Sequence, residues 1–362
     1  RPSSAFVETA PSLSVNSDWS RNRLGFSASA DNYTYFSAPS QNYTNYNLAL
    51  GGGYTIGRHD LNLGFAHQLA HELGTEIGAV ASSVPVPYTL DDLRADYTIE
   101  SGRFQFIPNL DLRHYAFGNA VILGQTVSQQ YRDRNVLSGG VTTRYELSDQ
   151  RAIVVVVQGS TSQFLQSMLS PLPPAAPTLP PPRPNSNTVL LLAGLDYAAT
   201  GPWRYRLLAG IETRAFQAST YGTHTAPVLE GSVIYTPTGL TTVTGVVRRE
   251  IEDPQSESSS GYTYTGVGVF VDHEYRRNIL LQGRASFQAV DYFNNGGGST
   301  NYSLGATVSW LLNRRLSLSA SYDYVHQISS GQNQNVATAS PGSLTSPSYV
   351  RNVFLLGAHL RL

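Results

Sequence analysis

Two histidines, His67 and His71, have the most suggestive spacing for chemistry in this sequence. On a helix, residues four apart are neighbours and could hold one metal ion between them. On a β-strand, the same spacing separates the two side chains by about 13 Å. Because apolar and polar residues alternate around this pair, we expect a strand here and no metal site.

Catalytic constellations are sparse in the rest of the sequence. We find no Gly-x-Ser-x-Gly nucleophile elbow and no phosphate-binding loop. His114 and His224 could each serve in a Ser–His pair, but no residues near them form a recognisable triad. We therefore expect neither enzymatic activity nor a bound cofactor.

Charged residues recur at every second position in many segments, with apolar residues between them. Arg204 and Arg206, for example, alternate with Trp203, Tyr205 and Leu207. Successive side chains of a strand point to opposite faces, so these segments predict strands with one polar and one apolar face. The charges expected on the polar, interior face are Asp92, Arg94, Asp96, Glu100, Asp111, Arg113, Arg144, Glu146, Arg204, Arg206, Glu212, Arg214, Arg248, Glu250, Asp272, Glu274, Arg276 and Arg284.

The signs of these interior charges are mixed, which predicts a hydrated, ion-paired lumen. A ring that selects ions would carry a single sign. The charges could contact a substrate, or they could only crosslink the inner wall, and the sequence favours neither reading. A net charge of −1 gives no reason to expect nucleic acid as a partner.

The composition points to a membrane barrel. Charged residues make up only 14% of the 362 residues, hydrophobic residues 41%, and there are 22 Tyr and no Cys or Lys. No run approaches the roughly 20 apolar residues of a membrane helix. A closed barrel is the other structure that satisfies backbone groups in a bilayer. We predict one all-β domain over 1–362, a transmembrane antiparallel up-and-down β-barrel, with a soluble β-sandwich as the alternative.

Short and long connections alternate along the chain, as in outer-membrane barrels with tight periplasmic turns. About seventeen strands are recognisable, and the first, near 5–19, and the last, 349–362, run in the same direction. Closure therefore requires one more strand, either upstream of Arg1 or folded from the first residues, or one segment is miscounted. We expect about 18 strands, with 16 as the alternative. The start at Arg1 also suggests that a signal peptide has been removed after secretion through the periplasm.

Aromatic residues cluster near the predicted strand ends. Amphipathic rings favour the headgroup level, so we expect them to form two outward-facing girdles. The alternative is that they reflect β-propensity alone. The predicted girdle residues are Trp19, Tyr33, Tyr35, Trp203, Tyr275 and Trp310.

A proline-rich connection over 167–187 includes Pro173, Pro174, Pro181 and Pro182. Such a segment favours extended polyproline geometry and forms a semi-rigid spacer. We predict a loop at the mouth that either limits passage or lies solvated on the surface.

Several short motifs resemble one known family. They are Ser-Ala-Phe-Val-Glu-Thr-Ala-Pro-Ser-Leu-Ser-Val at 4–15, Asp18-Trp19-Ser20, Asn42-Tyr43 and Tyr131-Arg132-Asp133-Arg134. With these motifs the chain resembles beta-barrel porin 2, a family of outer-membrane barrels often associated with exopolysaccharide secretion. The resemblance implies a conduit for exopolysaccharide export in the outer membrane of a Gram-negative bacterium. A diffusion porin for small hydrophilic solutes, or a structural surface barrel with a plugged lumen, are the alternatives.

The resemblance also implies partners. We expect contacts with outer-membrane lipid and lipopolysaccharide, and a periplasmic polysaccharide-export protein as a further partner. The C-terminal residues 357–362 are similar to the signal read by the barrel-assembly machinery, although that signal commonly ends in an aromatic residue and this chain ends in Leu362. Phe354, Leu356 and Leu360 would form the lipid face of the closing strand.

Overall fold

Nearly every described residue of the protein belongs to a strand. The computed structural model describes residues 4–19, 21–167, 182–198, 201–253, 259–293, 297–330 and 347–360. Two short 3₁₀ turns, η1 (Pro39–Gln41) and η2 (Gln130–Arg132), interrupt the strands. The strands are β1 (Phe6–Thr9), β2 (Ser12–Asn16), β3 (Asn22–Tyr35), β4 (Tyr43–Ile56), β5 (His59–Glu72), β6 (Val86–Ser101), β7 (Phe104–Phe117), β8 (Asn119–Ile122), β9 (Gln125–Ser128), β10 (Arg134–Ser148), β11 (Arg151–Phe164), β12 (Ser186–Ala198), β13 (Trp203–Phe216), β14 (Thr223–Thr238), β15 (Thr241–Glu252), β16 (Tyr262–Arg276), β17 (Ile279–Tyr292), β18 (Gly298–Leu311), β19 (Leu316–Ser330) and β20 (Tyr349–Leu360).

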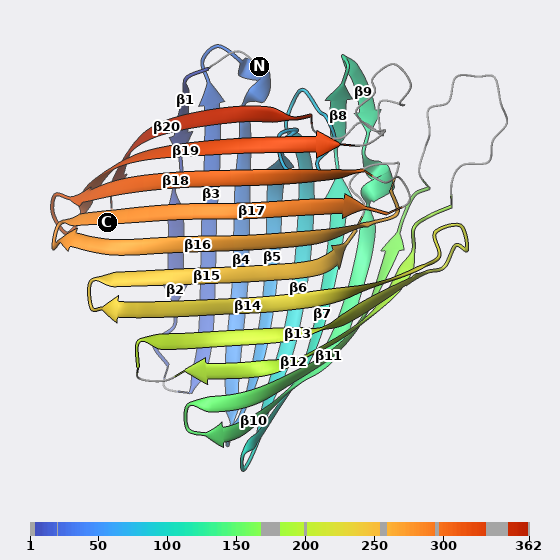
Figure 1. The fold of residues 1–362 in the computed structure, drawn as a ribbon, viewed down its shortest axis with the longest axis vertical. Coiled ribbons are helices and arrows are strands. Elements are labelled where there is room, and N and C mark those ends of the chain that lie inside the picture. The colour runs from blue at the N-terminus through green and yellow to red at the C-terminus, as the bar shows by residue number, and fades with distance from the viewer. Residues whose placement is uncertain are drawn as a thin grey trace.

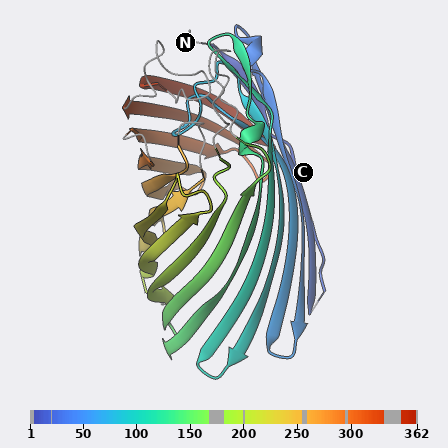
Figure 2. The ribbon, with the colours of Figure 1, turned by 90° about the vertical axis from the view of Figure 1, so that its right-hand side faces the viewer.

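Eighteen of these strands form one antiparallel sheet that curls into a barrel, which confirms the predicted fold class (Figures 1 and 2). From β2 onward, consecutive strands pair with each other, except that β7 pairs with β10 because β8 and β9 form a separate hairpin. β1 and β2 lie one after the other along β3, so they share one position in the sheet.

The ladder that would close the barrel is not formed among the described residues. β20 pairs with β19, and β1 and β2 pair with β3. Because every pairing is antiparallel and β1 and β2 share a position, these two edges run in the same direction. They cannot form an antiparallel ladder with each other, and the additional closing strand stays a prediction.

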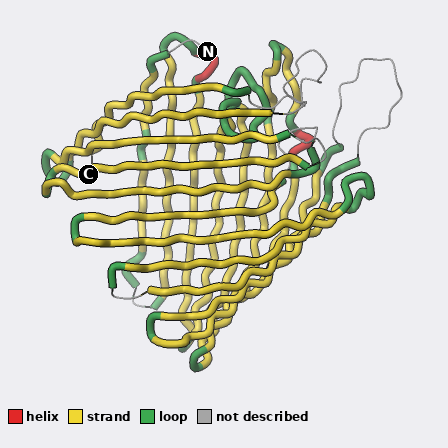
Figure 3. The backbone as a smooth tube through the Cα atoms, in the orientation of Figure 1, coloured by secondary structure: helices red, strands yellow, loops and turns green. Residues whose placement is uncertain are grey.

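Short turns lie at one end of the strands and long connections at the other, as Figure 3 shows. Tight turns at Gly57 and Gly102 use a positive φ, of 65° and 60°, that only glycine adopts readily. The opposite end carries connections such as 73–85 and 118–133. This segregation agrees with the alternation in the sequence.

The two faces of the sheet differ as the sequence predicts. On β13, exposed Trp203, Leu207 and Ile211 alternate with Leu208 and Glu212, which are buried. The connection 73–85 leaves β5 and packs Ile77 against Tyr262 and Tyr292 on β16 and β17, far away in the sheet. A segment can reach those residues only across the concave side, so their face lines the interior.

The inner wall is packed most closely over β11–β14. Val154, Leu192, Leu208 and Val228 form a buried apolar cluster there. At Gly210 on β13, a Cβ atom would collide with the carbonyl oxygen of Leu191 on β12. A glycine is therefore required for the two backbones to approach this closely.

Candidate conduit and its extracellular mouth

Ion pairs cover the polar inner wall, some within one strand and others between strands. Asp111 on β7 accepts from Arg113 at 2.6 Å and lies 3.3 Å from Arg94 on β6, which also pairs with Asp92. Arg206 on β13 lies 3.5 Å from Glu230 on β14. Further pairs are Arg144–Asp196, Arg248–Glu250, Arg284–Asp323 and, at 3.9 Å, Arg214–Glu212.

The remaining predicted interior charges have other surroundings. Asp96 accepts a hydrogen bond from Asn62, and Asp272 accepts one from Gln282. The guanidinium of Arg276 lies over the ring of Tyr275. Glu100, Glu146, Arg204 and Glu274 lie near the short-turn ends of their strands. Positive and negative groups thus alternate along the wall, and no single-signed ring forms among the described residues.

A buried ion pair fastens the long-loop end of the lumen. Arg132 of η2 donates from Nη1 and Nη2 to the two carboxylate oxygens of Glu72, at 3.1 and 2.6 Å. Both residues are almost fully buried, with 3% and 7% exposure. The guanidinium also lies 4.0 Å above the ring of Phe117. Bidentate geometry and the aromatic contact together offset the cost of removing two charges from water.

A second cluster of hydrogen bonds and ion pairs joins three strands to Asp253, the residue that follows β15. Asp253 accepts hydrogen bonds from Arg134 of β10 and Arg214 of β13, both at 2.8 Å. Ser162 of β11 lies 3.5 Å from the same carboxylate. Burial raises the pKa of Asp253, but the two guanidinium groups outweigh burial and hold its pKa below the usual value.

The connection 73–85, which we call the mouth loop, crosses the opening. Besides the Ile77 contact, the hydroxyl of Tyr349 on β20 donates to the carbonyl oxygen of Thr75. The amide of Gln41 in η1 donates to the carbonyl oxygen of Ser83 at 2.6 Å. The mouth loop therefore contacts the wall on several sides of the barrel.

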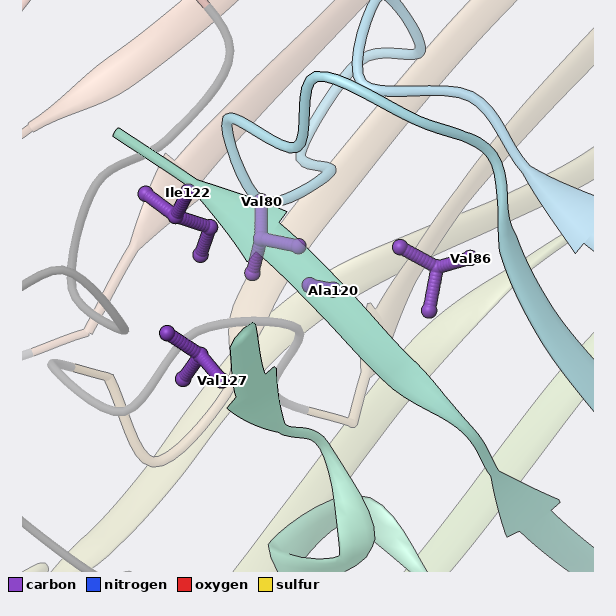
Figure 4. Packing of buried hydrophobic residues seen from close by; sticks show 5 residues of the cluster. All are labelled: Val80, Val86, Ala120, Ile122 and Val127. Atoms are coloured by element: carbon purple, nitrogen blue, oxygen red, sulfur yellow. The ribbon is translucent and has the colours of Figure 1, made fainter. Parts of the chain in front are cut away.

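The mouth loop has an apolar core with the β8–β9 hairpin. Val80, Val86, Ala120, Ile122 and Val127 form this core, and Figure 4 shows their side chains gathered between the two segments. Val80, Val86, Ala120 and Ile122 are completely buried. Apolar burial of this kind stabilises the inward position of both segments.

One carboxyl group in the mouth loop has an unusual pKa. Glu76 is exposed to water at one side, accepts a hydrogen bond from the backbone N–H of Leu73 at 3.1 Å and lies near the carboxylate of Glu72. Desolvation by the surrounding protein, with a smaller contribution from Glu72, raises the pKa of Glu76 to about 7.

Inward-facing aromatic side chains surround the mouth loop and form what we call the mouth collar. Tyr33 and Tyr43 stack with ring centroids 4.7 Å apart, and Tyr88 and Phe117 stack at 5.3 Å. Tyr33 and Tyr35 share the face of β3 opposite the exposed Leu24 and Phe26. The mouth collar comprises Tyr33, Tyr35, Tyr43, Tyr88, Phe117, Phe164, Phe216, Tyr262, Tyr292 and Tyr349.

The inward placement of Tyr33 and Tyr35 differs from the girdle prediction, because aromatic spacing alone does not give the face of a strand. The other girdle residues, Trp19, Trp203, Tyr275 and Trp310, are exposed beside short turns. Trp203 stacks on Tyr235 at 4.0 Å.

Of the predicted proline-rich loop, Pro173, Pro174 and Pro181 lie outside the described residues. The carbonyl oxygen of Pro182 accepts a hydrogen bond from the Tyr221 hydroxyl at 2.7 Å. The prediction for the proline-rich loop therefore stays untested, and among the described residues the mouth loop is the connection that crosses the opening. One feature of the sequence could have predicted this role. Residues 77–86 are mostly apolar, although they lie in a connection that was expected to be polar.

His67 and His71 contact other side chains. His67 pairs with Asp91, and Nδ1 of His71 lies 3.0 Å from the side-chain oxygen of Asn45. Within the described ranges, no three His, Asp or Glu side chains converge to hold a metal ion.

None of the described helices is long and apolar enough to cross a membrane.

Comparison with known proteins agrees with the observed architecture. A sequence model of the family described as "Putative beta-barrel porin 2" matches residues 1–341. No curated protein matches the chain.

Among solved structures, the FrpB iron transporter of Neisseria meningitidis is similar in two variants. The F3-3 variant has a TM-score of 0.50 at 11% identity, over 91% of this chain and 62% of that chain. The F5-1 variant has a TM-score of 0.53 at 10% identity, over 98% of this chain and 67% of that chain. A mutant ferric enterobactin receptor, PfeA of Pseudomonas aeruginosa, has a TM-score of 0.52 at 8% identity, over 99% of this chain and 70% of that chain. The chain thus spans 62% to 70% of the length of these proteins, and the likeness shows the shared outer-membrane barrel fold.

Proposed function

This chain belongs to the family described as Putative beta-barrel porin 2, and from that premise we propose that it is an export conduit for an exopolysaccharide. The barrel would lie in the outer membrane of a Gram-negative bacterium, inserted by the barrel-assembly machinery. Its short turns would face the periplasm, where a polysaccharide-export protein would deliver the polymer. The long connections would face the outside.

The mouth collar is the observation that carries this proposal. Sugar rings present apolar faces that stack on aromatic side chains and hydroxyl edges that bond to polar groups. Tyr33, Tyr43 and Tyr88 offer ring faces together with hydroxyl groups at the opening. Below the collar, neighbouring charges such as Arg206 and Glu230 already satisfy one another, so the wall would hold a passing polymer only weakly.

The mouth loop would act as the gate of this conduit. In its observed position it is held by the apolar core with β8–β9 and the contacts of Thr75 and Ile77. The Glu72–Arg132 pair fixes the end of β5, from which the mouth loop leaves, to η2 after the β8–β9 hairpin. Displacing it would expose the aromatic rings of the collar to the polymer. A closed resting state would keep periplasmic contents inside the cell when no polymer is moving.

A diffusion porin for small hydrophilic solutes is the second candidate function. The mixed-charge, polar wall of β6, β7, β13 and β14 favours it, because such a wall admits many polar solutes. A structural barrel with a plugged lumen is the third, favoured by the extensive contacts of the mouth loop.

The deciding experiment is deletion of the gene, followed by measurement of secreted polysaccharide and of small-solute uptake. We expect polysaccharide to be lost and uptake to be unchanged. Expression of the wild-type gene should restore export, whereas a Tyr33→Ala/Tyr43→Ala variant should restore it poorly at equal barrel levels. Normal polysaccharide with slowed uptake would replace the export proposal with the porin, and no change in either would favour the structural barrel.

A further inference from the structure

A row of polar side chains crosses the outer surface of five neighbouring strands. His67 of β5 is the cross-strand partner of Asp91 of β6, which is also the partner of His114 of β7. His114 is paired with Asn135 of β10, and Asn135 with Gln163 of β11. We call these five residues the outer polar row.

The outer polar row faces away from the lumen. Its sequence neighbours Asp92 and Arg113 belong to the ion pairs of the inner wall, and successive side chains of a strand point to opposite faces. Four members of the row are each followed, two positions closer to the short turns on the same strand, by an exposed apolar residue. These apolar residues are Phe65, Leu93, Leu112 and Leu137. The row therefore lies on the lipid-facing surface, at the long-loop border of the apolar band.

A hollow joins the polar row to the apolar residues beneath it. It has a volume of about 430 Å³. Phe65, Leu93, Leu112 and Leu137 line its apolar part, and Asp91, His114, Asn135, Thr161 and Gln163 line its polar part. Asp92, Arg113 and Val136, which belong to the inner face of the same strands, also border it. The polar part of the hollow lies toward the long connections and the apolar part toward the short turns, which is the order of head group and acyl chain in a lipid of the outer leaflet.

The hydrogen bonds of the row leave several groups without a protein partner. Nδ1 of His67 lies 2.6 Å from Oδ1 of Asp91, and Nδ1 of His114 lies 2.6 Å from Oδ1 of Asn135. Within the part of the chain that the structure describes, Oδ2 of Asp91, Nε2 of His114 and the side-chain amide of Gln163 bond to no other protein group. Contact with hydrocarbon would leave these groups unsatisfied at a considerable free-energy cost.

We propose that this hollow binds a sugar-headed lipid of the outer leaflet. The acyl chain would lie against Leu93, Leu112 and Leu137, while hydroxyl and amide groups of the sugar would bond to Asp91, His114 and Gln163. The row contains a carboxylate and no Arg, and the guanidinium of Arg113, which borders the hollow, is already paired with Asp111. A head group that offers hydrogen-bond donors therefore suits the row better than a bare phosphodiester. The site depends on the membrane orientation of the barrel and not on what passes through the lumen.

Native mass spectrometry of the full chain in a detergent without a sugar head group tests the proposal. The probe is deep-rough lipopolysaccharide, and phosphatidylcholine, whose head group has no hydrogen-bond donor, is the comparison lipid. We expect saturable binding of the lipopolysaccharide at one site. The double variant His114→Leu/Asn135→Leu should weaken it at least about tenfold, because it removes the hydrogen bond of His114 to the head group together with the residue that orients the imidazole. Thr161→Phe, which fills the hollow and leaves the row intact, should weaken it similarly.

The matched control is His326→Leu. His326 lies on the outer face of β19, opposite exposed Val350, and far from the row in the sheet. This substitution should leave binding unchanged. All three variants place apolar side chains on the lipid-facing surface, so the barrel should still fold, as heat-dependent gel mobility would verify. Equal affinity in the wild type and the double variant, an equal loss in His326→Leu, or equal binding of phosphatidylcholine would each overturn the proposal.

Discussion

At the scale of single residues, the most consequential contact is the buried pair of Glu72 and Arg132. Removing one partner of such a pair leaves a buried charge unpaired, at a cost of about 3–5 kcal/mol. We predict that Arg132→Met releases the mouth loop and raises the single-channel conductance of the protein in planar bilayers.

The double variant Glu72→Leu/Arg132→Met is the control for this prediction. Replacing both charges with apolar side chains of similar size leaves no uncompensated group. The conductance of the double variant should return toward that of the wild type. If the single variant stays as closed as the wild type, the pair does not hold the gate.

Glu76 adds a dependence on pH. With the mouth loop inward its pKa is about 7, whereas a carboxyl group released into water returns to an ordinary value near 4.5. Between these values the inward state binds more protons, so its stability falls as the pH rises. We predict more frequent channel opening at pH 8 than at pH 5, and no such change in Glu76→Gln, as single-channel recordings over this range would show. An unchanged pH response in Glu76→Gln would assign the effect to another group.

Much of the residue-level description follows from the sequence, and the remainder has a physical reason. Alternation alone predicts that Asp111 and Arg113 share a polar face, and the two side chains do form an ion pair. Alternation could not identify Asp253 as the partner of Arg134 and Arg214, because that contact depends on how the end of β15 bends inward. Contacts made by connections depend on the tertiary arrangement and not on a local period.

At the scale of strands, period-two patterns and turn residues were sufficient for most boundaries. The exceptions have local causes. The single strand expected near 5–19 is divided into β1 and β2 at Pro11, which has no N–H to donate to a ladder. The connection expected at 118–127 contains the β8–β9 hairpin, whose four-residue strands are too short for a clear alternation to show.

The close approach of β12 and β13 leads to a prediction about stability. Gly210→Ala places a methyl group against the backbone of Leu191, and overpacking of this kind costs about 1–3 kcal/mol. We expect the variant to unfold at lower urea concentration in micelles than the wild type. Gly283→Ala on β17, where a Cβ meets nothing within 4 Å, is the matched control and should unfold like the wild type. Equal destabilisation by both would argue against the crowding at Gly210.

At the scale of the whole molecule, the inner wall predicts weak ion selectivity. Pairs such as Arg144–Asp196 and Arg284–Asp323 place opposite charges side by side, so their fields largely cancel over the width of a lumen. For the opened Arg132→Met variant in a potassium chloride gradient, we expect a reversal potential close to zero. A strongly cation- or anion-selective current would show that unpaired charges, and not the paired wall, control permeation.

The contacts of the mouth loop on distant strands give it a mechanical meaning. The mouth loop leaves the wall between β5 and β6, is bonded to β20 through Tyr349 and packs Ile77 against the cluster on β16 and β17. It therefore links distant parts of the wall across the opening, as a brace does. Its release would uncover the opening and remove this link in the same step, so that a single local event sets both the access to the lumen and the freedom of the wall around it.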